Sequence, residues 1–146
     1  MSTLVDKLTA PEVRPKVVAA CVDLVDKEVS SKGGLSGMAV KAGYAVIKAI
    51  KPGFIAQVVE SLLPDFAAAM QPMYERESAN GPDAFAKWAE GHKSEIADAL
   101  LSVTDARAQR AKNATIKKTY EKLRGSARDH VSAAVPNLIA ALRPFF

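Results

Sequence analysis

The sequence predicts an all-α protein, a single-domain helical bundle of about six or seven helices. Apolar residues recur at intervals of three and four along most of the chain, which is the spacing of one helix face. Alanine is abundant and no run shows the alternation of a strand. A chain of 146 residues with 49% hydrophobic and 25% charged residues has the size and composition of one globular domain. We therefore expect residues 1–146 to form one domain.

The first expected helix follows a capping box at Thr9–Glu12, where a threonine hydroxyl and a glutamate carboxylate each bond the other residue's backbone amide. Regular helix is expected from Pro15, because proline is well tolerated only in a first helical turn. This helix should end near Lys32, with Gly33 in the left-handed position that often follows a helix.

The next helix is expected between Ser36, as its cap, and Pro52-Gly53. The helix expected after Gly53 carries an apolar stripe from Phe54 to Met70, and the stripe stays on the same helix face across Pro64. We therefore predict either a kink in this helix or the start of a new helix at Pro64. The segment "SANGPD", residues 78–83, then predicts a loop.

Two long helical patterns follow this loop. Residues 83 to about 111 predict one helix, weakened at Gly91. The pattern over residues 116–142 is interrupted at Gly125 and Pro136.

An internal similarity has two interpretations, of which two related halves, residues 1–77 and 82–146, is the less favoured. "LPDFAAAMQPMY", from Leu63, aligns with "VPNLIAALRPFF", from Val135, at an offset of 72 residues. A weaker match aligns "AACVDLVDKEV" with "DALLSVTDARA", seven residues out of step. The alternative is that two amphipathic helices with similar prolines resemble each other by convergence.

The stretch of residues 33–53 is apolar except for its lysines. Only about 16 residues lie between its glycine and proline breaks, and a transmembrane helix needs about 20, so we expect no transmembrane segment. An interfacial membrane helix would show a broad charged face and Trp or Phe anchors, which this segment lacks. A helix that is apolar on most sides is typical of a buried position, and Gly43 indicates a close helix crossing. The segment is therefore predicted to be the central core helix, with Val40, Gly43, Tyr44 and Ile47 in the core.

No group of residues has the spacing of a catalytic or metal site. His92 and Glu95 form a lone i, i+3 pair, whereas a di-iron bundle needs a second copy. His130 is expected to be a packing residue, and Cys21 lies on an apolar stripe. We therefore predict that the protein is not an enzyme and has no cofactor or metal. A single cysteine excludes an intrachain disulfide, and no secretory signal is visible at the N-terminus, so a cytoplasmic location is expected.

Positive charge is concentrated in residues 105–129, which contain eight Lys/Arg and three Asp/Glu. This segment is either an ordinary solvated helix face or a surface for an anionic partner. Tyr120 is the only aromatic residue in it and is expected to point inward, so a stacking platform for bases is missing. The candidate residues for an anionic partner are Arg107, Arg110, Lys112, Lys117, Lys118, Lys122, Arg124 and Arg128.

The chain resembles an uncharacterised family of short bacterial all-helical proteins. The matching pieces are "VRPKVVAACVDLVDKEV", "GLSGMAVKAGYAVIKAIKP", "LLPDF", "VTDARA" and "YEKLRG", which together cover most of the chain. The resemblance implies a bacterial cytosolic protein and supplies no activity, cofactor or catalytic residue.

The leading functional hypothesis is a non-enzymatic helical module for protein interaction or self-association, with a homodimer as one form. The C-terminal "LRPFF" is expected to dock onto the body of the protein or onto a second subunit. One alternative is nucleic-acid binding through residues 105–129. Another is an apolar ligand or lipid bound between helices, along Met38, Phe66, Met70, Met73 and Trp88.

Overall fold

The computed structural model describes residues 3–146 and confirms the predicted all-α fold. Within these residues it contains seven α-helices, a short 3-10 helix at the C-terminus and no strand. The elements are α1 (Leu4–Thr9), α2 (Arg14–Ser31), α3 (Gly34–Lys48), α4 (Phe54–Glu77), α5 (Pro82–Glu90), α6 (Lys93–Gln109), α7 (Ala114–Leu142) and η1 (Arg143–Phe145).

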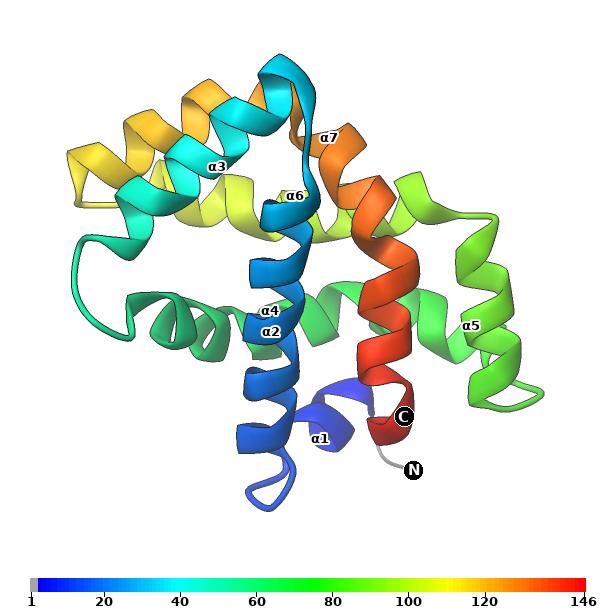
Figure 1. Ribbon diagram of the computed structural model, residues 1–146. Coiled ribbons are helices and arrows are strands. Elements are labelled where there is room, and N and C mark those ends of the chain that lie inside the picture. Colours follow the sequence, from blue (N-terminus) through cyan, green and yellow to red (C-terminus); the bar gives the residue numbers. More distant parts are fainter. Residues whose placement is uncertain (1–2) are drawn as a thin grey trace.

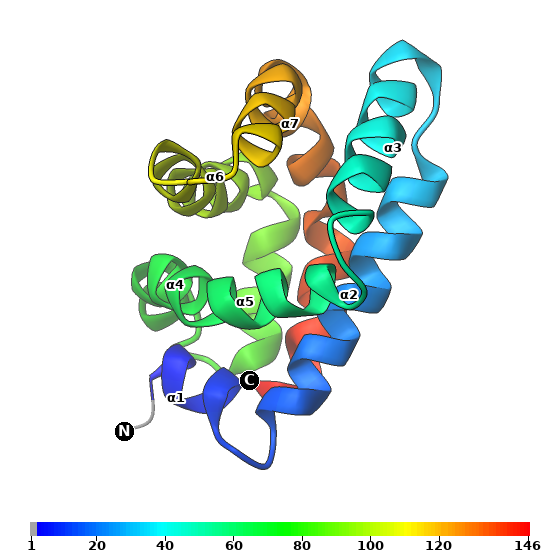
Figure 2. The same cartoon turned by 90° about the vertical axis from the view of Figure 1, so that its left-hand side faces the viewer.

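The bundle has two crossing layers (Figure 1). One layer holds α2 beside the second half of α7, and the other holds α4 beside α6. Figure 2 shows the two layers from the side, with α3 and the first half of α7 together at one end of the molecule. The short helix α1 packs on α4, and α5 packs on α7.

The core lies between the layers and receives side chains from every helix except α3. Its fully buried members include Leu4 and Leu8 of α1, Val17 of α2, Phe85 of α5 and Ile96 of α6. Helix α4 contributes Leu63, Ala67, Met70, Met73 and Tyr74, and α7 contributes Val135, Ile139 and Leu142.

The predicted capping box at Thr9–Glu12 is wrong, because a short helix that the sequence pattern did not reveal precedes it. Thr3 caps α1: its hydroxyl accepts from the Asp6 amide at 3.1 Å, and the Asp6 carboxylate accepts from the Thr3 amide at 3.1 Å. Thr9 ends this helix, and its hydroxyl donates to the Val5 carbonyl. Helix α2 then starts one residue before Pro15, close to the expected position.

The turn between α2 and α3 also differs from the prediction, which put Gly33 in the left-handed conformation. Gly33 has an extended backbone with φ −125°, and Gly34 takes the left-handed conformation with φ 72°. Ser36 lies inside α3 and does not cap it. Helix α3 ends at Lys48, before the predicted end at Pro52-Gly53, and Gly53 takes φ 74° directly before α4 begins.

Both long helical patterns after residue 83 differ from the prediction: the first is broken into two helices, and the second is one continuous helix. The predicted helix over residues 83–111 is two helices, because the chain turns at Gly91 and His92 between α5 and α6. Gly91 costs helix stability, and the turn lets α5 pack across the end of α7. In contrast, α7 continues through Gly125 and Pro136, as α4 continues through Pro64 and Pro72. Each proline removes one helical hydrogen bond, and burial of the surrounding face offsets this loss.

The aligned segments of the proposed halves occupy corresponding places. Leu63 and Val135 are both buried, and so are the pairs Ala67 and Ile139, and Met70 and Leu142. Pro64 and Pro136 both lie inside helices. The helix pairs also correspond. The alignments match α2 with α6 and α4 with α7, and α2 lies against α7 in one layer as α6 lies against α4 in the other. These positions agree with the sequence alignment, and both interpretations, two related halves and convergence, stay open.

Candidate interaction surface

Helix α3 lies outside the core, so its predicted role as the central core helix is wrong. It contributes no residue to the core, and only its glycines Gly37 and Gly43 are buried. Val40, Tyr44 and Ile47 are half-buried where α3 rests on α2 and α7. Apolar residues on nearly all sides of this helix therefore do not mean that other helices surround it.

The predicted close crossing at Gly43 is confirmed. A Cβ placed on Gly43 would lie 2.7 Å from Leu123 Cδ1 and 3.1 Å from Thr119 Cγ2, both on α7. Glycine suits this position because any side chain would force Leu123 and Thr119 to shift or would push α3 away from α7. This contact fixes which side of α3 faces the protein and which side faces solvent.

The solvent side of α3 is apolar. Among residues 3–146, the large hydrophobic side chains that are strongly exposed are Leu35 at 88%, Met38 at 66% and Val46 at 44%, and all three belong to α3. Alanines at positions 42, 45 and 49 are also exposed and continue the same strip. We call this strip, Leu35, Met38, Ala42, Ala45, Val46 and Ala49, the α3 apolar face.

Lysines border the α3 apolar face on the side towards α2. Lys41 and Lys48 are exposed and share this edge. Lys48 Nζ lies 3.9 Å from the Asp26 carboxylate and 5.5 Å from the centre of the Tyr44 ring. The Tyr44 hydroxyl donates to Asp26, and burial together with this carboxylate raises the pKa of Tyr44 above its usual value. No Asp or Glu occurs between Glu28 and Glu60, so the segment carries only positive charge.

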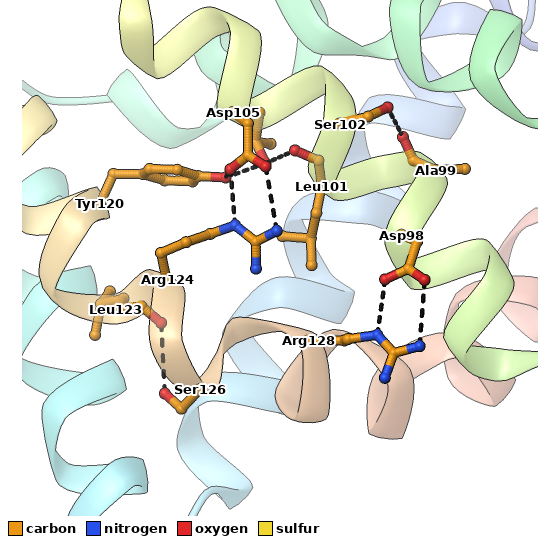
Figure 3. A network of polar contacts seen from close by, with 11 residues as sticks. Asp98, Ala99, Leu101, Ser102, Asp105, Tyr120, Leu123, Arg124, Ser126 and Arg128 are labelled. Carbon is orange, nitrogen blue, oxygen red and sulfur yellow. Dashed lines mark hydrogen bonds and ion pairs between the residues drawn. The ribbon is translucent and has the colours of Figure 1, made fainter.

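Three arginines of the predicted basic segment form ion pairs within the protein, and Figure 3 shows two of them, Arg124 and Arg128. Arg124 makes two hydrogen bonds to Asp105, at 2.8 and 3.2 Å, and Arg128 makes the same pair to Asp98. These contacts join α7 to α6. Arg107 binds the Asp65 carboxylate at 2.7 Å and so joins α6 to α4.

The paired carboxylates have lowered pKa values. Hydrogen bonds from Arg128 lower the pKa of Asp98, with a smaller contribution from its positive charge. Hydrogen bonds from Arg124 and Tyr120 do the same for Asp105. Tyr120 points towards α6, where its hydroxyl contacts Asp105 and Thr104, so it offers no ring for stacking at the surface.

The other basic residues of the segment are exposed and have no ion-pair partner in the part of the chain that the structure describes. They are Arg110, Lys112, Lys117, Lys118 and Lys122. The surface predicted for an anionic partner thus contains two kinds of residue. Three arginines form ion pairs with carboxylates of the protein, and the five other basic residues, mostly lysines, are unpaired within residues 3–146.

Two of the free lysines border α3. Thr119 and Leu123 face α3, and Tyr120 and Arg124 face α6. At about 100° per residue, Lys118 and Lys122 lie beyond the α3 contact, on the side away from α6. The α3 apolar face therefore has Lys41 and Lys48 along one edge and Lys118 and Lys122 along the other.

The histidines do not form a metal site. His92 stacks on Trp88, with ring centres 4.4 Å apart, and Glu95 binds Arg76 instead. His130 is half-buried, and its Nε2 atom has no hydrogen-bond partner among residues 3–146. Residues 3–146 contain no group of three His, Cys, Asp or Glu side chains that could hold a metal ion.

The C-terminal aromatic residues dock onto the protein's own body. The Phe146 ring lies 5.4 Å from Tyr74 and 5.5 Å from Phe85, measured between ring centres. The residues predicted to line a ligand site are dispersed: Met38 is exposed on α3, Met73 is in the core and Trp88 stacks on His92. Phe66 and Met70 alone among them line a common cavity, where α2 crosses α4.

The sequence did not predict that the α3 apolar face lies next to Lys118 and Lys122 of α7. The two segments are about 75 residues apart in the chain, and the packing of α3 on α7, which includes the close contact at Gly43, places them together. Gly43 itself was the available signal, because it predicted a close neighbour without naming that neighbour.

Fold and surface together define an all-helical protein with one exposed apolar helix face edged by lysines. None of the helices within residues 3–146 combines the length and apolar character needed to cross a bilayer. The chain belongs to a family of unknown function, DUF6918, whose sequence model matches residues 4–145. This membership confirms the resemblance to an uncharacterised family. Comparison with curated proteins and with solved structures gave no significant match.

Proposed function

We propose that this protein is a non-enzymatic interaction module that docks onto an anionic membrane surface through the α3 apolar face and its lysines. The observation that carries the proposal is the position of Leu35, Met38 and Val46, which are the strongly exposed large hydrophobic residues of the described chain and lie together on one helix. A helix that lies in a membrane interface buries such a face just below the lipid headgroups. The sequence of α3 alone lacks the broad charged face of such a helix, but in the folded protein the exposed Lys118 and Lys122 of α7 supply it, and the exposed Leu35 and Met38 take the place of aromatic anchors.

Charge complementarity favours an anionic lipid surface. Lys41, Lys48, Lys118 and Lys122 lie on both sides of the apolar face, at positions where ammonium groups reach lipid phosphates while the face is buried. Lysines near an anionic membrane each contribute about 1 kcal/mol. A second copy of the chain fits this face poorly, because pairing it with itself would bring the lysines of both copies together.

The shape of the face also favours lipid over a protein partner. Protein partners are usually held by side chains that fill pockets. Five of the hollows over residues 3–146 are lined entirely by residues outside α3. Hydrocarbon chains are fluid and need no such pocket.

Nucleic acid is less well supported as the partner. Arg107, Arg124 and Arg128 are engaged with carboxylates, and Tyr120 points to α6. The remaining lysines would attract phosphates, but a polyanion offers nothing to bury the exposed Leu35 and Met38. The apolar face is therefore better explained by lipid.

Vesicle flotation of the full chain tests the proposal. We expect binding to vesicles that contain phosphatidylglycerol, weaker binding at high salt, and little binding to phosphatidylcholine alone. Leu35→Ser with Met38→Ser should abolish binding. Lys118→Ala with Lys122→Ala should weaken it by about 2 kcal/mol, roughly thirtyfold.

The matched control is Lys16→Ala with Lys93→Ala, which removes two exposed lysines from α2 and α6. This variant should bind as well as the unchanged protein. The proposal is wrong if the protein does not bind anionic vesicles even at low salt, or if both lysine pairs weaken binding equally. A dimer that separates on Met38→Ser would assign the face to a second copy. A DNA mobility shift that depends on Lys118 and Lys122 but not on Leu35, without vesicle binding, would assign it to nucleic acid.

A further inference from the structure

An apolar cavity of about 110 Å³ lies where α2 crosses α4, close to α7. Its walls carry no polar surface, and they include Cys21, Val25, Leu63, Phe66, Ala67 and Leu142. Protein interiors are close-packed and rarely contain voids much larger than a water molecule. A cavity of this size in the core therefore calls for an explanation.

The cavity arises because small side chains meet at this crossing. Ala67 of α4 is fully buried, and Cys21 of α2 lies near it in the cavity wall. The internal alignments of the sequence place Ile139 opposite Ala67 and Leu100 opposite Cys21. The second half of the chain thus has large residues at the positions where the first half has small ones.

The walls indicate what the cavity can hold. A buried water needs two to four polar partners, and none is present here. A cavity of roughly 150 Å³ lined by Leu, Ile and Phe stays dry and binds benzene. We propose that this cavity binds a small uncharged hydrocarbon about the size of a six-carbon ring. The inference does not rest on the membrane-docking proposal, because α3 contributes no residue to the cavity wall.

Two further features suit such a ligand. Burial raises the pKa of the Cys21 thiol to about 11, so the wall stays uncharged at neutral pH, and sulfur makes favourable contacts with aromatic rings. Leu24, Val25 and Val59 are only half-buried. Small movements of these side chains would give a ligand a short route to the cavity.

Benzene serves as the probe, with the full chain observed by thermal unfolding and by NMR. Benzene should raise Tm in a concentration-dependent way and shift the methyl signals of Val25, Leu63 and Leu142. Phenol has the same ring with an added hydroxyl, for which the cavity wall offers no acceptor. It should therefore bind at least tenfold more weakly.

Ala67→Ile fills the cavity with the residue that the second half carries, and its matched control is Ala68→Ile, at the exposed neighbouring position on α4. We expect the benzene-dependent rise in Tm to be lost in Ala67→Ile and kept in Ala68→Ile. Cys21→Leu provides a second filling variant if circular dichroism shows that Ala67→Ile does not fold.

The proposal is overturned if benzene leaves Tm and the methyl signals unchanged up to its solubility limit. It is also overturned if a folded filling variant responds to benzene as the control does, or if phenol binds as tightly as benzene.

Discussion

Gly43 of α3 and Leu123 of α7 lie so close together that a methyl group on the glycine would come within 2.7 Å of Leu123 Cδ1. Thr119, one helical turn before Leu123 on α7, would have its Cγ2 atom 3.1 Å from the same methyl group. This contact holds α3 against α7 and so places the α3 apolar face beside Lys118 and Lys122. The close approach at Gly43 is thus one of the contacts that set the geometry of the proposed docking surface.

Replacing Gly43 by alanine should destabilise the protein, although alanine normally stabilises a helix. The helix propensity gain is about 0.5–1 kcal/mol, and overpacking a close contact costs about 1–3 kcal/mol. Because the leucine methyl can shift partway, we expect Gly43→Ala to lower the free energy of unfolding by about 1 kcal/mol. Urea denaturation measures this change.

Gly125 provides the control, since it is also inside a helix but has no neighbouring atom within 4 Å of the point where a Cβ would lie. Gly125→Ala should raise the free energy of unfolding by about 0.5–1 kcal/mol. Equal stabilisation by both substitutions would mean that α3 is not seated on α7 as described.

The longer helices around the core were predictable because each carries one apolar face and one polar face, whereas the six-residue helix α1 and the break between α5 and α6 were not predicted. Helix α3 misled the same reasoning, since a helix apolar on most sides fits a buried position and an unpartnered surface equally well. The positions of Lys41 and Lys48 did not distinguish a buried helix from an exposed one, because either kind of helix can carry a polar edge. The distinction depends on which helices contact α3, and that is a property of tertiary packing.

The division of the basic segment was likewise hidden from the sequence. Whether Arg107, Arg124 and Arg128 are free depends on carboxylates that α4 and α6 bring opposite them. Asp65 is distant in the chain from Arg107, and no periodicity connects the two residues. Arginine suits these sites because its planar group can bind both oxygens of a carboxylate, whereas lysine cannot.

Acid should weaken the protein through Asp98 and Asp105. Because Arg128 and Arg124 lower the pKa values of these carboxyls in the folded state, their stabilisation is present above the unfolded pKa of about 3.9 and is lost as pH falls through the folded values. We expect the free energy of unfolding to decline between about pH 5 and pH 2. Denaturation at a series of pH values measures the slope.

The double variant Asp98→Asn and Asp105→Asn should flatten this slope. Glu121→Gln is the control, because Glu121 is exposed and makes no ion pair within residues 3–146. If the double variant declined with acid as steeply as this control, the arginine pairs would not be formed in solution.

Removing the last aromatic ring should destabilise the protein without changing its mass in solution. Phe146 contacts both Tyr74 and Phe85, and each aromatic pair contributes about 0.5–1.5 kcal/mol beyond the area it buries. Phe146→Ala should therefore lower the free energy of unfolding by about 2 kcal/mol. Light scattering coupled to gel filtration should give the same mass before and after the change. A dimer that separates on Phe146→Ala would instead place this residue at a subunit interface.

Cys21 should react slowly with alkylating reagents in the folded protein. With its pKa raised to about 11 by burial, only about 0.1% of the thiol is ionised at pH 8, compared with about a quarter for an exposed cysteine. Alkylation by iodoacetamide at pH 8 should be at least a hundredfold slower in buffer than in urea, and its rate should rise about tenfold per pH unit up to pH 10. Because Cys21 is the only cysteine of the chain, mass spectrometry follows the reaction without any substitution. Equal rates in buffer and in urea would show that the thiol is open to solvent, and the crossing of α2 and α4 could then not enclose the cavity.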